Sequence, residues 1–437
     1  MKTLAVIMLG AAGLLSGCPI IGGATYTVGG TVTGLRGSGL VLELNSADGL
    51  SFSGNGGFVF GTRLAHGAAF TVAVKSQPVN PSQTCAVRNG AGTVNRISLS
   101  NVIIACSATG RFAYVADELS NSVSAYVIDS ASGALVASSA SPYAANGTAP
   151  AALTIDPNGQ FLYVANSGSN NLSTFSIDNT TGNLTLFGFS TATGSGPAAV
   201  AVDPTDHYLY VANQQSNTVS AYAISNGSLT AVAGSPYAVG LAPVSLAIDP
   251  NGNFLFVTNF GDNSVSLFLI DPASGMLSAI AGAPFGTGAG PQSIAIDPTE
   301  AYAFVADQAS NSVSSYALNS STGVLTPVPG SPFAVTSNPQ SLVVDPAGRY
   351  VFAANSAANQ VAAYSITASG ALNFVSATAA GLRPAAIAVD PSGQFLYAAN
   401  FDSNTVSAYT VSATGALVSV PGSPFPTFLQ PSSIAIY

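Results

Sequence analysis

The residues of this chain that could do chemistry are mostly carboxylates, and many recur at a regular spacing. Six of the aspartates that precede a proline recur at intervals of 45 to 48 residues, often as Asp-Pro-x-Gly: Asp156, Asp203, Asp249, Asp297, Asp345 and Asp390. If the fold arranged these six carboxylates in a ring, they would suit calcium. The same pattern suits a type I turn, with Asp first, Pro second and Gly fourth. We therefore expect these aspartates to build turns.

A second set of polar residues stands at the end of an apolar run in each repeat. It comprises Asp117, Asn166, Asn213, Asn259, Asp307, Asn355 and Asn400. Just beyond these positions come Gln214, Phe260, Gln308 and Phe401. Asparagine at a strand end usually serves a turn. The other interpretation is a neutral surface whose amides and aromatic faces bind a sugar or a peptide, which makes all these residues candidate ligand contacts.

These positions belong to a repeat that is well seen in residues 197–243. Each copy contains four short apolar strands separated by turn residues, and it opens with a proline. The seven opening prolines are Pro150, Pro197, Pro243, Pro291, Pro339, Pro384 and Pro431. Four strands at this period predict a propeller blade, so we expect an all-β fold with a seven-bladed β-propeller over residues 107–437.

One blade is predicted to be shared between the two ends of the repeat region. The segment from Arg111 to Asp117 matches the second strand of the other copies, and no first strand precedes it. A matching first strand is found at residues 431–437, with the sequence Pro-Ser-Ser-Ile-Ala-Ile-Tyr. We therefore expect the C-terminal strand to complete this blade and close the ring, which leaves no open sheet edge.

The charge of the chain is low and unevenly distributed. Charged residues make up 6% of the sequence, against about 25% in an ordinary soluble domain. From Ser107 onward there are sixteen Asp or Glu residues and three arginines, a net charge of −13. Neutralising nucleic-acid phosphates needs clustered Lys and Arg, so we expect no nucleic-acid partner.

Residues 1–18 have the features of a bacterial export signal. Lys2 is followed by an apolar run over residues 4–15, which is too short to span a bilayer. Leu-Ser-Gly-Cys at residues 15–18 resembles the lipobox of bacterial lipoproteins. This resemblance implies lipid on Cys18 and a membrane anchor at the outer membrane or the periplasm-facing envelope. The alternative is an ordinary signal peptide with an incidental cysteine.

Residues 19–24 are predicted to be a linker, and residues 25–106 a small β domain. Short alternating apolar runs between Gly-rich turns favour an immunoglobulin-like or transthyretin-like sandwich. Cys85 and Cys106 are the only cysteines besides Cys18. An exported protein meets an oxidising compartment, so we expect them to form a disulfide, with two free buried thiols as the alternative. His66 is the only histidine of the domain, and we predict no metal site.

The propeller repeats resemble a known family. Tyr-Val-Ala-Asn occurs at residues 163–166 and 210–213, each time followed closely by Ser-Asn. These residues resemble the YVTN repeats of the lactonase-type seven-bladed propellers, a group that includes bacterial 6-phosphogluconolactonase and the carboxymuconate-cyclising enzymes. The resemblance covers residues 107–437. It implies the propeller fold and a site at one mouth of the central channel.

In the enzymes of that family, an Arg-His pair follows the opening proline of a blade, and a Glu follows its second strand. The resemblance implies that Glu118, within Asp-Glu-Leu-Ser-Asn at residues 117–121, is the catalytic carboxylate. No arginine or histidine directly follows any opening proline here. Arg383, directly before Pro384, is the cation expected at this rim and is the second catalytic candidate. Lactone chemistry needs a proton donor or acceptor and a group that stabilises developing charge.

These observations support different functions. The missing Arg-His pair and the low charge favour a lipid-anchored scaffold that binds a protein or carbohydrate at the channel mouth without chemistry. The resemblance and Glu118 support the alternative, a lactone hydrolase or cyclase with a divergent site. A purely structural surface protein is a third interpretation. For none of these do we expect a cofactor or a metal.

Overall fold

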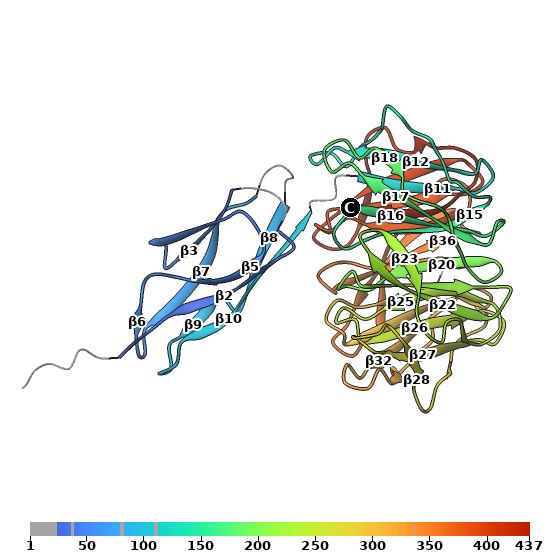
Figure 1. The fold of residues 1–437 in the computed structure, drawn as a ribbon. Helices are drawn as coiled ribbons and strands as arrows, with labels where there is room; N and C mark the ends of the chain where they lie inside the picture. Colours follow the sequence, from blue (N-terminus) through green and yellow to red (C-terminus); the bar gives the residue numbers. More distant parts are fainter. Residues whose placement is uncertain (1–23, 36–38, 79–82, 109–111, 336) are drawn as a thin grey trace, which may run out of the picture. The chain divides into compact units, whose positions relative to one another are not determined.

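The computed structural model describes residues 24–35, 39–78, 83–108, 112–335 and 337–437. Every regular element in these residues is a β-strand, so the predicted all-β class is confirmed (Figure 1). The described residues form two compact units: a smaller one with those up to 78 and from 85 to 106, and a larger one with the rest. The described residues contain no helix able to cross a membrane. The predicted export signal and Cys18 lie outside the described residues.

The smaller unit is a sandwich of two four-stranded sheets, as predicted. One sheet has the order β5 (Gly56–Val59), β2 (Val28–Thr33), β10 (Leu99–Ala108) and β8 (Gln83–Arg88). The other has the order β4 (Asp48–Phe52), β3 (Leu40–Leu44), β7 (Ala69–Ser76) and β9 (Ala91–Thr93). The short strands β1 (Thr25–Tyr26) and β6 (Leu64–Ala65) pair with each other. Cys85 of β8 and Cys106 of β10 form the predicted disulfide.

The larger unit contains seven blades, and each is an antiparallel sheet whose strands are counted outward from the axis. The first strands are β44 (Pro431–Ile436), β15 (Pro150–Ile155), β20 (Pro197–Val202), β25 (Pro243–Ile248), β30 (Pro291–Ile296), β35 (Pro339–Val344) and β39 (Pro384–Val389). The second strands are β11 (Phe112–Asp117), β16 (Phe161–Asn166), β21 (Tyr208–Asn213), β26 (Phe254–Asn259), β31 (Tyr302–Asp307), β36 (Tyr350–Asn355) and β40 (Phe395–Asn400).

The third strands are β12 (Ser122–Ile128), β17 (Asn171–Ile177), β22 (Thr218–Ser225), β27 (Ser264–Ile270), β32 (Ser312–Leu318), β37 (Gln360–Ile366) and β41 (Thr405–Val411). The outer strands are β13 (Leu135–Ala137), β18 (Leu184–Leu186), β23 (Ser228–Ala231), β28 (Leu277–Ala279), β33 (Leu325–Pro327), β38 (Leu372–Ala379) and β42 (Leu417–Ser419). Short strands also pair with six of the third strands: β14 (Tyr143–Ala144), β19 (Thr191–Ala192), β24 (Tyr237–Ala238), β29 (Phe285–Gly286), β34 (Phe333–Ala334) and β43 (Phe425–Pro426).

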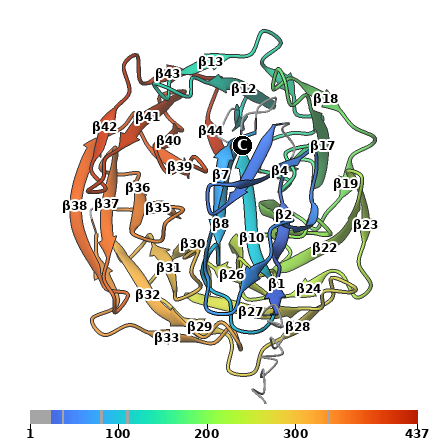
Figure 2. The same ribbon diagram turned by 90° about the vertical axis from the view of Figure 1, so that its left-hand side faces the viewer.

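The C-terminal strand closes the ring, as predicted. β44 pairs antiparallel with β11, with Ile434 opposite Val115 and Ile436 opposite Ala113. Figure 2 shows the resulting ring, in which the blade of β12 and β13 stands beside the blade of β41 and β42. β44 covers the inner edge of β11, so the second strand of this blade is paired on both sides, like the second strands of the other six blades.

Apolar contacts between neighbouring blades form the core of the propeller. Seven buried clusters occur in the described residues, one for each pair of adjacent blades. The second strands are almost completely buried, because they lie between two other blades. The first strands are largely half-buried, because they line the channel.

A glycine before each outer strand fixes how closely the blades approach. Gly182 and Gly275 have positive φ values, and each packs against an aromatic ring of the preceding blade. A Cβ atom on Gly182 would lie 2.4 Å from the ring of Phe112, and one on Gly275 would lie 2.2 Å from the ring of Tyr208. Only glycine satisfies both the backbone conformation and this contact.

The six repeated aspartates hold the turns between first and second strands, as predicted. Asp390 is typical: its Oδ1 accepts a hydrogen bond from the backbone N–H of Phe395 at 2.7 Å. Each of the other five likewise accepts a backbone N–H from the first residue of the following strand. These carboxylates therefore fix the turns at the end of the blades opposite the predicted site.

Candidate functional site at the channel mouth

The start of the first strand and the end of the second strand meet at one rim of every blade. Pro197 pairs with Asn213, for example, and the register then shifts at the next residue. The same irregularity follows the opening proline in all seven blades. Such a bulge turns a side chain out of the ladder. The seven bulged residues all line one cavity of about 330 Å³: Ala151, Ala198, Val244, Gln292, Gln340, Ala385 and Ser432.

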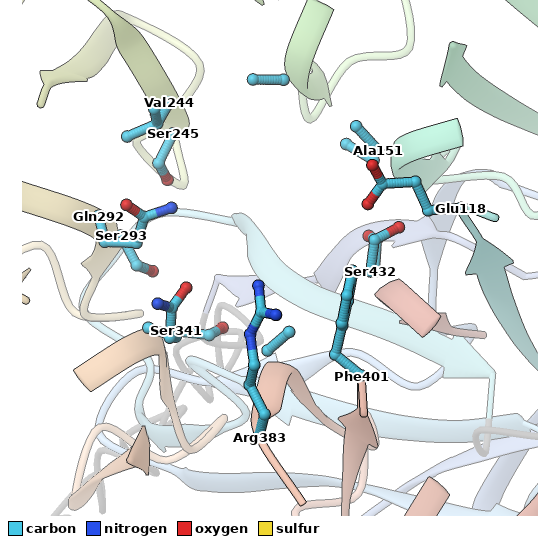
Figure 3. A pocket seen from close by; sticks show the side chains of 15 residues that line it. Glu118, Ala151, Val244, Ser245, Gln292, Ser293, Ser341, Arg383, Phe401 and Ser432 are labelled. Atoms are coloured by element: carbon cyan, nitrogen blue, oxygen red, sulfur yellow. The ribbon is translucent and has the colours of Figure 1, made fainter. Parts of the chain in front are cut away.

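Polar side chains make up most of the lining of this cavity (Figure 3). The bulged residues Ala151, Ala198 and Val244 come from three consecutive blades and contribute a smaller apolar part. Gln292 and Gln340 come from the next two blades and contribute amide groups. The repeat is symmetric in its backbone, so the types of the bulged residues decide which part of the mouth can form hydrogen bonds.

An asparagine between the second and third strands holds the rim of the next blade. Asn217 has a φ of 55°, and its Oδ1 accepts the backbone N–H of Ala242, directly before Pro243, at 2.8 Å. The same bond occurs in every blade, from Asn121, Asn170, Asn217, Asn263, Asn311, Asn359 and Asn404. Each opening proline is therefore positioned by the preceding blade.

The predicted ring of strand-end Asp and Asn residues does not reach the cavity. All seven side chains are 0% exposed: Asp117, Asn166, Asn213, Asn259, Asp307, Asn355 and Asn400. Six of them, all except Asn355, bond a serine hydroxyl group of the third strand. Asn213 Nδ2 donates to Ser220 Oγ at 2.9 Å, and Asp307 Oδ2 accepts from Ser314 Oγ at 2.6 Å. We therefore correct the expectation that these seven residues contact a ligand, because they are buried within the blades.

Two of the four residues just beyond this ring reach an open surface of the site. Phe401 lines the cavity. Gln308 lines a groove beside the cavity. Gln214 is exposed and Phe260 is half-buried, and neither is among the cavity-lining residues. The structure thus separates two positions that line an opening from two that lie outside it.

Glu118 follows β11 directly, is half-buried and faces the cavity. Burial raises the pKa of its carboxyl above the ordinary glutamate value, while the positive charge of Arg383 opposes the increase. Among the described residues of the propeller, it is the one carboxylate whose oxygens have no hydrogen-bond or ion-pair partner. The other fifteen propeller carboxylates all have such a partner.

Arg383 reaches the same cavity from the neighbouring blade, before β39. Its guanidinium carbon lies 4.3 Å from the centre of the Phe401 ring. Its Nη1 lies 3.4 Å from Asp402 Oδ1, and both side chains are about half exposed. The ion partner of Arg383 is thus Asp402, and Glu118 faces the cavity separately (Figure 3). The structure brings the two catalytic candidates to one cavity without pairing them.

Sequence reasoning did not identify Gln292, Gln340 and Asp402 as site residues. The two glutamines directly follow opening prolines, where three other blades carry alanine. This difference from the other blades was the sequence signal that could have identified the two glutamines as site residues. Asp402 gave no such signal, because its importance comes from the position of Arg383 in the folded chain.

His207 and Arg349 lie at the rim opposite the cavity. His207 lies in the turn before β21, where its Nδ1 is 2.8 Å from Thr205 Oγ1. Arg349 lies in the turn before β36, where its Nε is 3.3 Å from Asp345 Oδ2. No group of three His, Cys, Asp or Glu residues suited to a metal ion occurs in the described part of the chain.

The fold and this cavity define a class: a seven-bladed β-propeller with a candidate site at one mouth of its channel. The chain belongs to the family described as lactonase, 7-bladed β-propeller, whose sequence profile matches residues 69–245, 239–337 and 327–426. The family predicted from the YVTN repeats is confirmed. No curated protein matches the chain.

Solved structures share this fold at low sequence identity. A candidate 6-phosphogluconolactonase from Bacteroides uniformis ATCC 8492 is 20% identical with a TM-score of 0.66, over 75% of this chain and 99% of that chain. A second, from Bacteroides fragilis NCTC 9343, is 20% identical with a TM-score of 0.67, over 75% and 98%. The periplasmic gluconolactonase PpgL of Pseudomonas aeruginosa is 21% identical with a TM-score of 0.64, over 74% and 98%. These likenesses establish the fold alone.

Proposed function

We propose that the channel mouth hydrolyses a lactone, with Glu118 as the general base. The observation that carries this proposal is the unpartnered, half-buried carboxylate of Glu118 at the cavity. A general base needs a free acceptor oxygen and a pKa closer to neutral than that of an exposed carboxylate. Membership of the lactonase family supports the reaction class. The sequence alone favoured a binding scaffold, with lactone chemistry as the alternative.

In the proposed step, Glu118 takes a proton from water while the water oxygen bonds to the lactone carbonyl carbon. The carbonyl oxygen becomes negatively charged, and the guanidinium of Arg383 and the amide N–H groups of Gln292 are the donors available to stabilise it. The ring C–O bond then breaks. The proton passes from Glu118 to the leaving ring oxygen, and the product is the open hydroxy acid.

The charge of the propeller favours an uncharged lactone over a phosphorylated one. The net charge of −13 from Ser107 onward repels anions. Arg383 is already paired with Asp402. The side chains of Ala151, Ala198 and Val244 can contact the C–H groups of a ring, while the polar groups that make up most of the lining can bond its hydroxyl groups. We therefore propose neutral lactones of hydroxylated acids as the substrate class.

The test is hydrolysis of glucono-1,5-lactone and a panel of other lactones, measured above the uncatalysed rate. We expect Glu118→Gln to lower kcat by about 10²- to 10⁴-fold, the usual contribution of a general base. Glu300→Gln is the matched control, because Glu300 bonds Asn251 in a turn of the opposite rim. Because the pKa of Glu118 is raised, activity should increase with pH through a value above that of ordinary glutamate. Full activity in Glu118→Gln would overturn the proposal.

A second candidate function is ligand binding without turnover. It is favoured by the Arg383 to Asp402 ion pair, which lowers the net charge available to an oxyanion. It corresponds to a scaffold that holds a carbohydrate or protein at the mouth. This function would be favoured if calorimetry showed that a sugar binds to the protein while none of the tested lactones is hydrolysed.

Export and lipid anchoring remain proposals based on residues 1–18. We propose that Cys18 is acylated and holds the protein at the outer membrane or the periplasm-facing envelope. Expression in a bacterial host with labelled palmitate should label the wild-type protein and leave Cys18→Ser unlabelled and released from membranes. Cys85→Ser is the control, because Cys85 belongs to the disulfide. Label retained by Cys18→Ser would contradict the proposal.

A further inference from the structure

A shallow groove of about 530 Å³ crosses the rim beside the central cavity. It runs over the three consecutive blades that contain β31, β36 and β40. Gln340 and Arg383 line both the groove and the cavity, so the two spaces adjoin. A ligand seated in the cavity can therefore extend into the groove.

The groove is open because one blade carries a short side chain at its centre. Ser356 directly follows β36, at the place where the neighbouring blades carry Gln308 and Phe401. Ser356 Oγ donates to Asn338 Oδ1 at 2.5 Å and is buried. The sequence repeat alone gives this position no special role. Its effect comes from the longer side chains on both sides.

Hydrogen bonds within one wall hold two amides in fixed orientations. Asn338 Oδ1 accepts from Gln308 Nε2 at 3.0 Å and from Gln340 Nε2 at 3.2 Å. The Oε1 atoms of both glutamines have no hydrogen-bond partner among the described residues. Each is therefore an oriented acceptor for a ligand hydroxyl group, and little side-chain freedom remains to be lost on binding.

The opposite wall combines an apolar surface with a neutral ion pair. Leu382 is 56% exposed, and Ala357 is an exposed turn residue of the same groove. Arg383 and Asp402 supply donors and acceptors whose charges compensate each other. Oriented amides, an apolar face and no net charge fit a neutral ring that carries many hydroxyl groups. They do not fit a phosphate or a polyanion.

From this arrangement we infer that the groove binds a sugar unit attached to the lactone ring, so that the substrate class is the lactone of an oligosaccharide. This inference rests on the proposed function for the chemistry, but the binding of the second sugar unit stands on the groove itself. The lactone ring occupies the central cavity near Glu118. The attached sugar lies over Ser356, between Gln308 and Leu382.

The test compares substrates that differ by one sugar unit on the full chain. We expect kcat/KM for cellobiono-1,5-lactone or maltobiono-1,5-lactone to exceed that for glucono-1,5-lactone by about tenfold or more, a difference of about 1.4 kcal/mol. Ala357→Trp fills the groove from an exposed turn, and it should remove this preference. Gln308→Ala, which deletes one oriented amide, is a second variant that should reduce it. Gln215→Trp is the matched control, at the same turn position of the blade containing β21.

Calorimetry with unreactive sugars separates this inference from the proposed function. Cellobiose or maltose should bind more tightly than glucose to the wild type and to Glu118→Gln, and Ala357→Trp should abolish the difference. If no lactone is hydrolysed but this binding preference appears, the proposed function fails and the groove assignment stands. If lactones are hydrolysed with no disaccharide preference in rate or binding, the proposed function stands and the groove assignment is overturned. Absence of both hydrolysis and disaccharide binding overturns both.

Discussion

Two of the seven buried strand-end residues are aspartates, and their environment disfavours their charge. Burial raises the pKa of Asp117 to about 6, although hydrogen bonds from Ser124 and Thr427 oppose the increase. Burial also raises the pKa of Asp307 to about 6, against a hydrogen bond from Ser314. Five blades carry asparagine at this place. The two carboxylates are therefore a cost to the folded state at neutral pH.

Asp307→Asn should stabilise the propeller at neutral pH. The folded pKa of Asp307 is about 6 and its ordinary value is 3.8, so the wild type loses stability as pH rises between these values. The variant has no such loss, and above pH 6 its free energy of unfolding should be higher by up to about 3 kcal/mol. Urea unfolding from pH 4 to pH 8 measures this difference. The reciprocal change, Asn213→Asp, should lower the free energy of unfolding of the propeller at pH 7. If Asp307→Asn and the wild type were equally stable at pH 7, the buried charge of Asp307 would not be a cost to the folded state.

At the scale of elements, two local devices build the channel mouth. The bulge after each opening proline turns one side chain into the cavity. The asparagine at positive φ then holds the backbone before the next proline. Both devices recur in all seven blades, so the mouth has a regular frame. Functional differences between blades come from the side chains placed on that frame.

Asn217→Ala should weaken the contact between two blades without touching the cavity. Alanine disfavours the positive φ at this position and leaves the N–H of Ala242 without its acceptor. We expect a loss of about 1–3 kcal/mol in the free energy of unfolding, measured with urea. Asn217→Asp keeps the acceptor oxygen and should lose much less. Asn217→Gly allows the positive φ but lacks the acceptor, so its loss of stability measures the hydrogen bond alone. If Asn217→Gly were as stable as the wild type, the hydrogen bond to Ala242 would not hold the two blades together.

At the scale of the whole molecule, the ring depends on a strand from the end of the chain. β44 covers β11 and places Ile434 in the apolar cluster between two blades, where it is 7% exposed. Ser432 of the same strand lines the cavity. Closure of the fold and completion of the candidate site therefore depend on the same short segment, residues 431–437.

Removing residues 431–437 should open the ring and expose the edge of β11. An unpaired inner edge promotes association between chains, so we expect aggregation and faster proteolysis, measured by light scattering and limited digestion. A rescue variant can place the same strand before Phe112, joined by an Asp-Pro-Asn-Gly turn like the other blades. It should restore a monomeric, protease-resistant propeller. A truncated chain that stays as resistant as the wild type would show that β44 does not close the fold.

Much of the architecture could be predicted from the sequence because each blade carries its own local signals. The Asp-Pro turns, the apolar strands and the opening prolines specify one blade at a time, and their repetition predicts seven blades. The displaced first strand at Pro431 predicts the closure. The family also follows from these repeated residues, because they belong to the scaffold.

The candidate site was only partly predictable, because its members meet through tertiary contacts. Asp307 and Phe401 both stand near a strand end, yet the first is buried against Ser314 and the second lines the cavity. Arg383 was predicted at the rim, but its partner Asp402 was not. The blades are specified by the sequence alone, since turn and strand preferences are local. The set of side chains that face the channel mouth depends on the folded ring, because burial depends on residues of neighbouring strands and blades.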